Sequence, residues 1–212
     1  VPLPEGTGFV EAAALGVPAM TAQAALLTDG PINGMSVLVT GGAGAVGSLA
    51  IQMAKWAGAT RIVTTVSSDA KAQVAMADGA DAAVNYRELG IGDELRDALL
   101  DANGGRKFDR MVDVDFGSYI NLSAQVLHHG AVIGTYASMS EPKPTVDFYP
   151  LMMNNITIRL VEVYAQSPAR FAEICAGVNR ALEDGALTPR MDSTYALAET
   201  FSAHERVESG GQ

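Results

Sequence analysis

The chain has 212 residues, of which 48% are hydrophobic, and its formal net charge is −10. A chain of this size and composition buries one substantial core, and an acidic balance that is spread along the chain disfavours a nucleic-acid partner. The single cysteine, Cys175, excludes an intrachain disulfide framework and a cysteine-rich metal site.

The chain opens with an alanine-rich helical stretch. Residues 11–27 have the composition of a helix, and we expect an interruption at Pro18 because proline lacks the backbone N–H donor. No apolar stretch reaches the roughly 18 uninterrupted residues that a membrane span needs, and no signal peptide is visible. We therefore expect no membrane partner and a cytoplasmic location.

A glycine-rich turn follows, between a predicted strand at 36–41 and a predicted helix at 44–58. In a dinucleotide-binding fold, such glycines permit a tight turn, a close approach of the backbone to a phosphate, and close contact between helix and sheet. A second strand at 61–66 completes a βαβ unit, which favours a nucleotide site over a glycine turn that only joins two elements. The GxGxxG glycines expected at the pyrophosphate are Gly42, Gly44 and Gly47.

The end of the second strand predicts which nicotinamide cofactor is bound. An NAD site places a carboxylate about 20 residues past the glycine turn, and here that position is Ser67, followed by Ser68 and Lys71. Two hydroxyls and an ammonium suit a 2′-phosphate, so we predict NADP(H) over NAD(H). Asp69 argues against NADP(H) because it is a carboxylate near this position, and we interpret it as a first-turn charge on the next helix. The alternative for Lys71 is that it is an ordinary exposed helix lysine.

Strand and helix signals alternate through the rest of the chain. They predict an α/β fold with a doubly wound, parallel, six-stranded Rossmann sheet in the order 3-2-1-4-5-6, whose ligand crevice lies beside the glycine turn. Residues 187–195 are expected to be extended and to precede a short terminal helix. The remaining strands are predicted at 82–86, 109–115, 130–135 and 156–163, and the helices at 69–78, 91–102, 118–128 and 168–184.

Few side chains suggest covalent or metal chemistry. His128 and His129 are adjacent and have no further ligands at a suitable spacing. A helix C-terminus, which favours a partial positive charge on nearby side chains, explains them better, so we expect no metal site. Cys175 occupies an apolar helix position and is expected to be an inert core thiol. No serine stands in a GxSxG motif, which disfavours a hydrolase.

Four segments resemble the zinc-independent, zeta-crystallin-like quinone oxidoreductases of the medium-chain dehydrogenase/reductase superfamily, also called the zinc-type alcohol dehydrogenase superfamily. The resemblance covers nearly the whole chain. The segments are 12–22 (AAALGVPAMTA), 38–55 (LVTGGAGAVGSLAIQMAK), 79–88 (GADAAVNYRE) and 195–205 (YALAETFSAHE).

The resemblance implies an enzyme that transfers a hydride from NADPH to a quinone or similar activated acceptor. It places Thr21 near the nicotinamide, the amides of Ala45 and Val46 at the pyrophosphate, and Tyr86 over the adenosine ribose phosphate. Together with position at the carboxyl ends of strands, it also assigns to the nicotinamide pocket Asp115, Phe116, Gly134, Thr135, Tyr136 and Val163. No catalytic residue is assigned: Tyr136 is a candidate proton donor, with stacking on the cofactor as the alternative.

Members of this family carry a β-rich catalytic domain ahead of the matching segment. We therefore expect residues 1–17 to lead from that domain, 18–186 to form the dinucleotide-binding domain and 187–212 to return toward the missing domain, so that this chain is a fragment with little activity alone. We also expect a homodimer through the sixth strand. The alternatives are an enoyl or alkenal reductase of the same superfamily, and a non-catalytic NADP(H)-binding module.

Overall fold

The computed structural model describes residues 3–209 and contains one six-stranded, all-parallel sheet with the strand order β3-β2-β1-β4-β5-β6. The predicted fold class and strand order are confirmed. The strand order reverses between β1 and β4, and in doubly wound folds the ligand crevice lies at the carboxyl ends of the strands at this point. The strands are β1 (Ser36–Val39), β2 (Arg61–Val66), β3 (Ala82–Asn85), β4 (Phe108–Asp113), β5 (Leu127–Thr135) and β6 (Thr157–Leu160).

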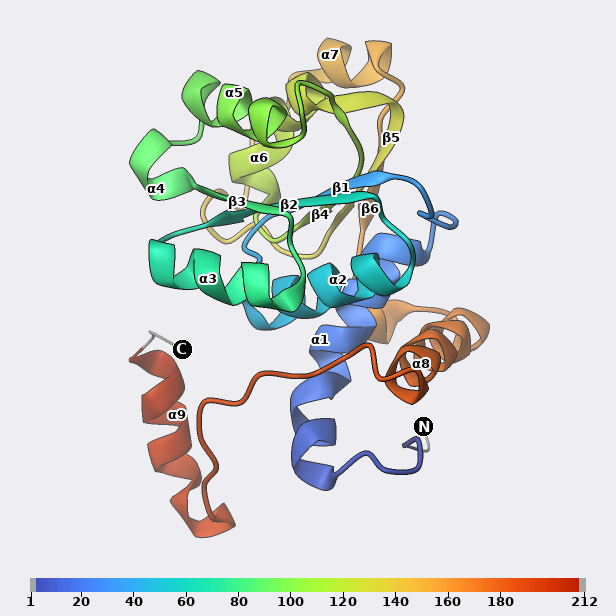
Figure 1. Cartoon of the computed structure of the whole chain (residues 1–212), viewed down its shortest axis with the longest axis vertical. Coiled ribbons are helices and arrows are strands. Elements are labelled where there is room, and N and C mark those ends of the chain that lie inside the picture. The colour runs from blue at the N-terminus through green and yellow to red at the C-terminus, as the bar shows by residue number, and fades with distance from the viewer. Residues whose placement is uncertain (1–2, 210–212) are drawn as a thin grey trace.

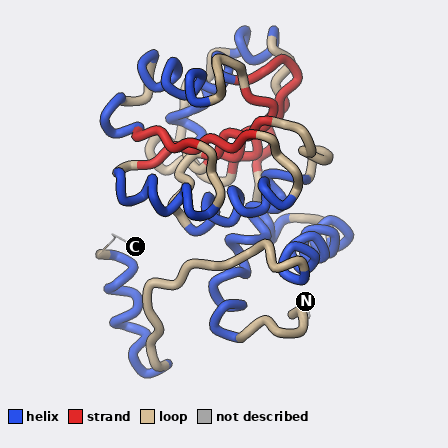
Figure 2. The backbone as a smooth tube through the Cα atoms, viewed as in Figure 1, coloured by secondary structure: helices blue, strands red, loops and turns tan. Residues whose placement is uncertain are grey.

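Helices cover both faces of the sheet, so each face has its own apolar core (Figures 1 and 2). One face packs against α1 (Phe9–Leu27), α2 (Ala45–Trp56), α3 (Asp69–Asp78) and α8 (Pro168–Glu183). The other packs against α4 (Tyr86–Leu89), α5 (Asp93–Ala102), α6 (Phe116–Val126) and α7 (Phe148–Met153). The strands are apolar because both of their faces are buried.

The carboxyl-terminal segment leads away from α8, crosses α1 in the view of Figure 1, and reaches a short 3-10 turn, η2 (Leu197–Glu199), and α9 (Thr200–Glu208). Residues 190–195 form no regular element before this helix, as expected from the sequence. Another 3-10 turn, η1 (Val163–Ala165), follows β6. The sixth strand is thus shorter than predicted, because the chain turns at Glu162, whose carboxylate accepts the amide of Tyr164.

Helix α1 differs from its prediction in two ways. It continues through Pro18 without a break, because seven of its side chains are buried against α2, α8 and the sheet and outweigh one missing N–H donor. At 19 residues it also has the length and hydropathy of a membrane span, which contradicts the expectation that no stretch reaches that length. In this structure α1 packs as a core helix, and it is continuous across the predicted domain boundary at residue 18.

The positions of His128 and His129 also differ from the expectation that they lie at a helix C-terminus. Helix α6 ends at Val126 and β5 begins at Leu127, so both histidines are exposed strand residues and not the end of a helix. Gly130, with φ of +79°, follows them at the irregularity where β5 changes register against β4. The helix-dipole explanation for this pair is therefore wrong.

Candidate functional site

The glycine turn lies at the carboxyl end of β1, with its backbone held against β2. The Gly41 amide donates to Thr65 Oγ1 at 3.1 Å, and the Gly42 amide donates to the Thr65 carbonyl at 3.1 Å. A Cβ on Gly42 would lie 2.1 Å from Thr64 Oγ1, and one on Gly47 would lie 2.3 Å from the Gly41 carbonyl oxygen. Both positions therefore require glycine because neighbouring atoms leave no room for a side chain.

Gly44 has a different environment. It is exposed, and the only neighbour of an added Cβ would be the Gly41 carbonyl oxygen at 3.3 Å. Gly44 is also the N-cap of α2. Among residues 3–209, the amides of Ala45, Val46 and Gly47 in the first turn of α2 have no hydrogen-bond acceptor. Free amides at a helix start, behind an unobstructed glycine, form an anion-binding surface that fits a pyrophosphate.

The corner at the end of β2 lies next to this turn, two residues beyond Thr65. Ser68 is the N-cap of α3, and its hydroxyl accepts the Lys71 amide at 3.3 Å. Asp69 occupies the first turn of α3, as expected. In the described part of the chain, the Ser67 hydroxyl and the Lys71 ammonium have no partner, so both remain available to a 2′-phosphate.

Tyr86 begins α4 after β3, and its half-buried ring packs against the core cluster of that face. It lies close enough to Tyr119 on α6 to affect that hydroxyl electrostatically. The structure therefore places Tyr86 at the same edge of the sheet as the glycine turn.

A buried carboxylate joins the ends of three strands at the crevice. Asp113, at the end of β4, accepts hydrogen bonds from Thr40 Oγ1 at 2.8 Å and from Thr135 Oγ1 at 3.0 Å. The Asp115 amide adds a third at 3.2 Å. Burial raises the pKa of Asp113, and these donors oppose the rise. The network fixes β1, β4 and β5 relative to one another where a nicotinamide pocket is expected.

The loops after β4 and β5 are joined by further hydrogen bonds. The Phe116 amide donates to the Ala137 carbonyl at 2.8 Å, and the Ser140 amide donates to Asp115 Oδ1 at 3.0 Å. Burial raises the pKa of Asp115, but hydrogen bonds from Ser118 and Ser140 outweigh burial and hold that pKa below its ordinary value. The Asp115 carboxylate therefore holds the two loops together.

The remaining predicted pocket residues lie on the α1 side of the sheet. Thr21 is buried in α1, and Val163 is buried in η1, which contacts α1. A Cβ on Gly134 would lie 2.1 Å from the Ala25 carbonyl oxygen, so this glycine permits α1 to pack on β5. Tyr136 is half-buried against the same core, and burial raises its pKa, so its hydroxyl keeps its proton at neutral pH.

Sequence reasoning missed Thr40, Thr65, Asp113 and Tyr119. The signal that could have found three of them is a polar side chain at the end of a mostly buried strand: the Thr40 and Thr65 hydroxyls and the Asp113 carboxylate. Among the described residues, no group of three or more histidine, cysteine, aspartate or glutamate side chains has the arrangement of a metal site. Cys175 is buried, as expected, with its thiol 3.8 Å from Met20 Sδ.

Residues 45–178, more than half of the chain, match the family model described as zinc-binding dehydrogenase. The chain belongs to this family. The zinc-binding dehydrogenase match begins at the first residue of α2, and the segments that carried the resemblance extend beyond it on both sides.

Individual relatives agree with this assignment. The quinone oxidoreductase of Pongo abelii is 28% identical over 211 residues, which are 98% of this chain and 61% of that protein. The chain thus spans about three fifths of the length of the curated quinone oxidoreductases that it matches. The tomato (Solanum lycopersicum) 2-methylene-furan-3-one reductase is 38% identical over 131 residues, covering 60% of this chain and 33% of the reductase.

Solved structures show the same fold with nicotinamide cofactors. The 2-octenoyl-CoA carboxylase reductase CinF, in complex with NADP and 2-octenoyl-CoA, is 30% identical with a TM-score of 0.81, covering 99% of this chain and 49% of CinF. The quinone oxidoreductase of Thermus thermophilus, solved also with NADPH, is 26% identical with a TM-score of 0.79, covering 98% of this chain and 65% of that protein. The cofactor in both is the phosphorylated one, in agreement with the predicted NADP(H).

Proposed function

We propose that this chain binds NADP(H) as the cofactor-binding part of an oxidoreductase that transfers a hydride to a quinone or a similar activated acceptor. The observation that carries the proposal is the glycine turn. Its exposed Gly44 and the three free amides of Ala45, Val46 and Gly47 fit a pyrophosphate. Ser67 and Lys71 would hold the 2′-phosphate, and Tyr86 would cover the adjoining ribose.

When bound, NADPH supplies the hydride, and the protein supplies position and electrostatics. The hydrogen bonds of Asp113 to Thr40 and Thr135 hold the strand ends that form the pocket floor. Thr21, Phe116 and Val163 would exclude water around the nicotinamide. Tyr136 keeps its hydroxyl proton and would either donate to a developing oxyanion or stack on the cofactor. We propose that the reaction is independent of zinc and takes place in the cytoplasm.

The second candidate is an enoyl or alkenal reductase. The similarity to CinF, a 2-octenoyl-CoA carboxylase reductase, and to the tomato 2-methylene-furan-3-one reductase favours it, because both names describe reduction of an activated double bond. The third is a non-catalytic NADP(H)-binding module.

An assay that distinguishes these functions must measure turnover, so it needs the amino-terminal part of the relatives that this chain does not span. We would join the amino-terminal part of the Pongo abelii quinone oxidoreductase to this chain and follow NADPH oxidation with a panel of quinones, enones and enoyl thioesters. The leading proposal predicts turnover of quinones above all other acceptors. Turnover of enoyl thioesters alone would favour the second candidate, and NADPH binding without any turnover would favour the third.

We also propose a homodimer that forms through the sixth strand. β6 is the edge strand of the sheet, so one side of its backbone is unpaired. Leu160 is 73% exposed, and the nearby α7 exposes Met152 and Met153. Sedimentation equilibrium with Leu160→Lys as the disrupting variant tests this state: a wild-type chain that sediments as a monomer contradicts it.

A further inference from the structure

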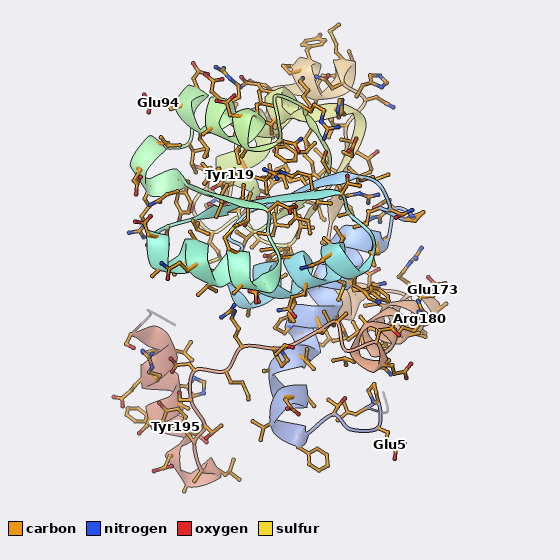
Figure 3. All side chains as sticks on the ribbon, viewed as in Figure 1. Glu5, Glu94, Tyr119, Glu173, Arg180 and Tyr195 are labelled. Carbon is orange, nitrogen blue, oxygen red and sulfur yellow. The ribbon has the colours of Figure 1, made fainter. Side chains whose placement is uncertain are left out.

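Tyr119 is a buried residue of α6 to which no binding role has been assigned. It is 4% exposed, and its ring belongs to the core cluster on the α6 face of the sheet. Figure 3 labels it among the side chains between α6 and the strands. Its hydroxyl lies 3.3 Å from Thr65 Oγ1 on β2, so it reaches across the interface between helix and sheet.

Thr65 connects Tyr119 to the glycine turn through a second hydrogen bond. Its side chain is fully buried, and Oγ1 accepts the Gly41 amide at 3.1 Å. Thr65 Oγ1 also lies within hydrogen-bonding distance of Tyr119 Oη, and either hydroxyl can be the donor of that bond. In either direction, the Thr65 hydroxyl accepts the Gly41 amide and bonds to Tyr119, so one hydroxyl connects the glycine turn to α6.

Gly41 in turn determines where α2 begins. Its φ of +67° lies in the left-handed region, and its carbonyl accepts the Gly44 amide at 3.0 Å. The same carbonyl oxygen stands 2.3 Å from the position of a Cβ on Gly47, so the first turn of α2 rests directly against it. A rotation of the Gly41 peptide would therefore move the free amides of that turn.

We propose that Tyr119 is a positioning residue for the pyrophosphate site, acting through Thr65 on Gly41 and hence on the amides at the start of α2. The proposal rests on the proposed NADP(H) function. The aromatic ring of Tyr119 contributes to packing, whereas its hydroxyl connects α6 to the glycine turn through Thr65. Burial raises the pKa of Tyr119 to about 12, so the hydroxyl remains neutral and hydrogen-bonding at physiological pH.

The test compares two ligands. NADPH contains the pyrophosphate, whereas adenosine 2′-monophosphate contains only the part expected at Ser67 and Lys71. For Tyr119→Phe, calorimetry should give NADPH binding weakened about 3- to 10-fold, the effect of one lost buried hydrogen bond, and adenosine 2′-monophosphate binding changed less than about 2-fold. Thr65→Val should weaken NADPH binding at least as much, because the Gly41 amide then loses its acceptor.

Two comparisons exclude a general loss of structure. Tyr149→Phe removes the hydroxyl of an exposed tyrosine on α7 and should leave both affinities at the wild-type values. Adding Tyr119→Phe to Thr65→Val should have little further effect, because both changes break one chain of hydrogen bonds. If Tyr119→Phe does not fold, Thr65→Ser, which keeps the hydroxyl, should retain NADPH affinity that Thr65→Val loses.

Wild-type NADPH affinity in Tyr119→Phe, or an equal loss for both ligands, would overturn the positioning role while leaving the proposed function intact. Failure of the unaltered chain to bind NADPH would instead remove the proposed function and this inference together.

Discussion

At the scale of one residue, we propose that Lys71 determines the preference for NADPH over NADH. Its ammonium has no partner in the described chain, and Lys71 lies in the first turn of α3, which begins two residues after Ser67. A charge-assisted hydrogen bond contributes about 1.5–3 kcal/mol. We expect Lys71→Ala to weaken NADPH binding by roughly 10-fold or more and to leave NADH binding unchanged, as measured by fluorescence titration of both cofactors.

Lys107→Ala is the matched control. Lys107 immediately precedes β4 at the amino edge of the sheet, opposite the crevice, so its loss should affect neither cofactor. Unchanged NADPH affinity in Lys71→Ala would mean that Lys71 is an ordinary surface lysine and that the cofactor preference has another origin.

Substitutions at Gly44 and Gly47 distinguish an effect on NADPH binding from an effect on folding stability. An added methyl at Gly47 would clash with the Gly41 carbonyl, so Gly47→Ala should lower the free energy of unfolding by about 1–3 kcal/mol. At Gly44 the nearest atom is 3.3 Å away, so Gly44→Ala should unfold at nearly the wild-type urea concentration. It should nevertheless weaken NADPH binding, because its methyl projects where the pyrophosphate passes.

Urea unfolding and NADPH titration of the two variants test this pair. Gly44→Ala with wild-type affinity for NADPH would contradict the placement of the pyrophosphate over this residue.

The glycine turn and the serine–lysine corner could be proposed as cofactor-binding residues from the sequence because each set is local. Gly42, Gly44 and Gly47 lie within six residues, and their proposed role follows from their spacing. Tyr119 and Thr65 are 54 residues apart, and Asp113 lies 73 residues from Thr40. Such contacts depend on strand register and helix packing, which no local pattern contains.

At the scale of elements, alternating apolar strands and helices predicted every strand of the sheet and its order. The errors arose where tertiary contacts override local propensity. Burial keeps α1 intact at Pro18, and pairing with β4 extends β5 back to Leu127, so the histidines after it became strand residues. The short helix α7 has no marked periodicity and was not predicted.

The end of α1 is fixed to the sheet by charge. Asp29 forms an ion pair with Arg159 on β6, and its carbonyl accepts Arg110 at 3.4 Å. The Arg159 hydrogen bond holds the pKa of Asp29 below its ordinary value of 3.8. A lowered folded-state pKa stabilises the protein above the unfolded pKa, and this contribution disappears as pH falls through the folded value.

Arg159→Met should therefore lower the free energy of unfolding at pH 7 by about 1 kcal/mol, a value suited to a partly exposed pair. The difference from wild type should shrink as the pH falls from about 5 toward 3. Urea unfolding across this range measures the difference. A difference that is constant over the whole range would show that the pair contributes through packing instead.

At the scale of the whole molecule, the sheet with its two helical layers forms the body, and the first turns of α1 and the segment through α9 extend from it (Figures 1 and 2). These extensions carry the large exposed apolar residues Phe9, Leu197 and Phe201. The body contains every residue proposed to bind the cofactor. We therefore propose that this chain binds the cofactor alone, and that turnover also needs the part of the relatives that this chain does not span.

The most direct test is calorimetric titration of the folded chain with NADPH and with NADH. We expect saturable binding of one NADPH per chain, with NADH bound about 10-fold more weakly, because the Ser67 and Lys71 corner selects the 2′-phosphate. Absence of saturable binding of either nucleotide would contradict the proposal that the amides at the start of α2 bind a dinucleotide pyrophosphate.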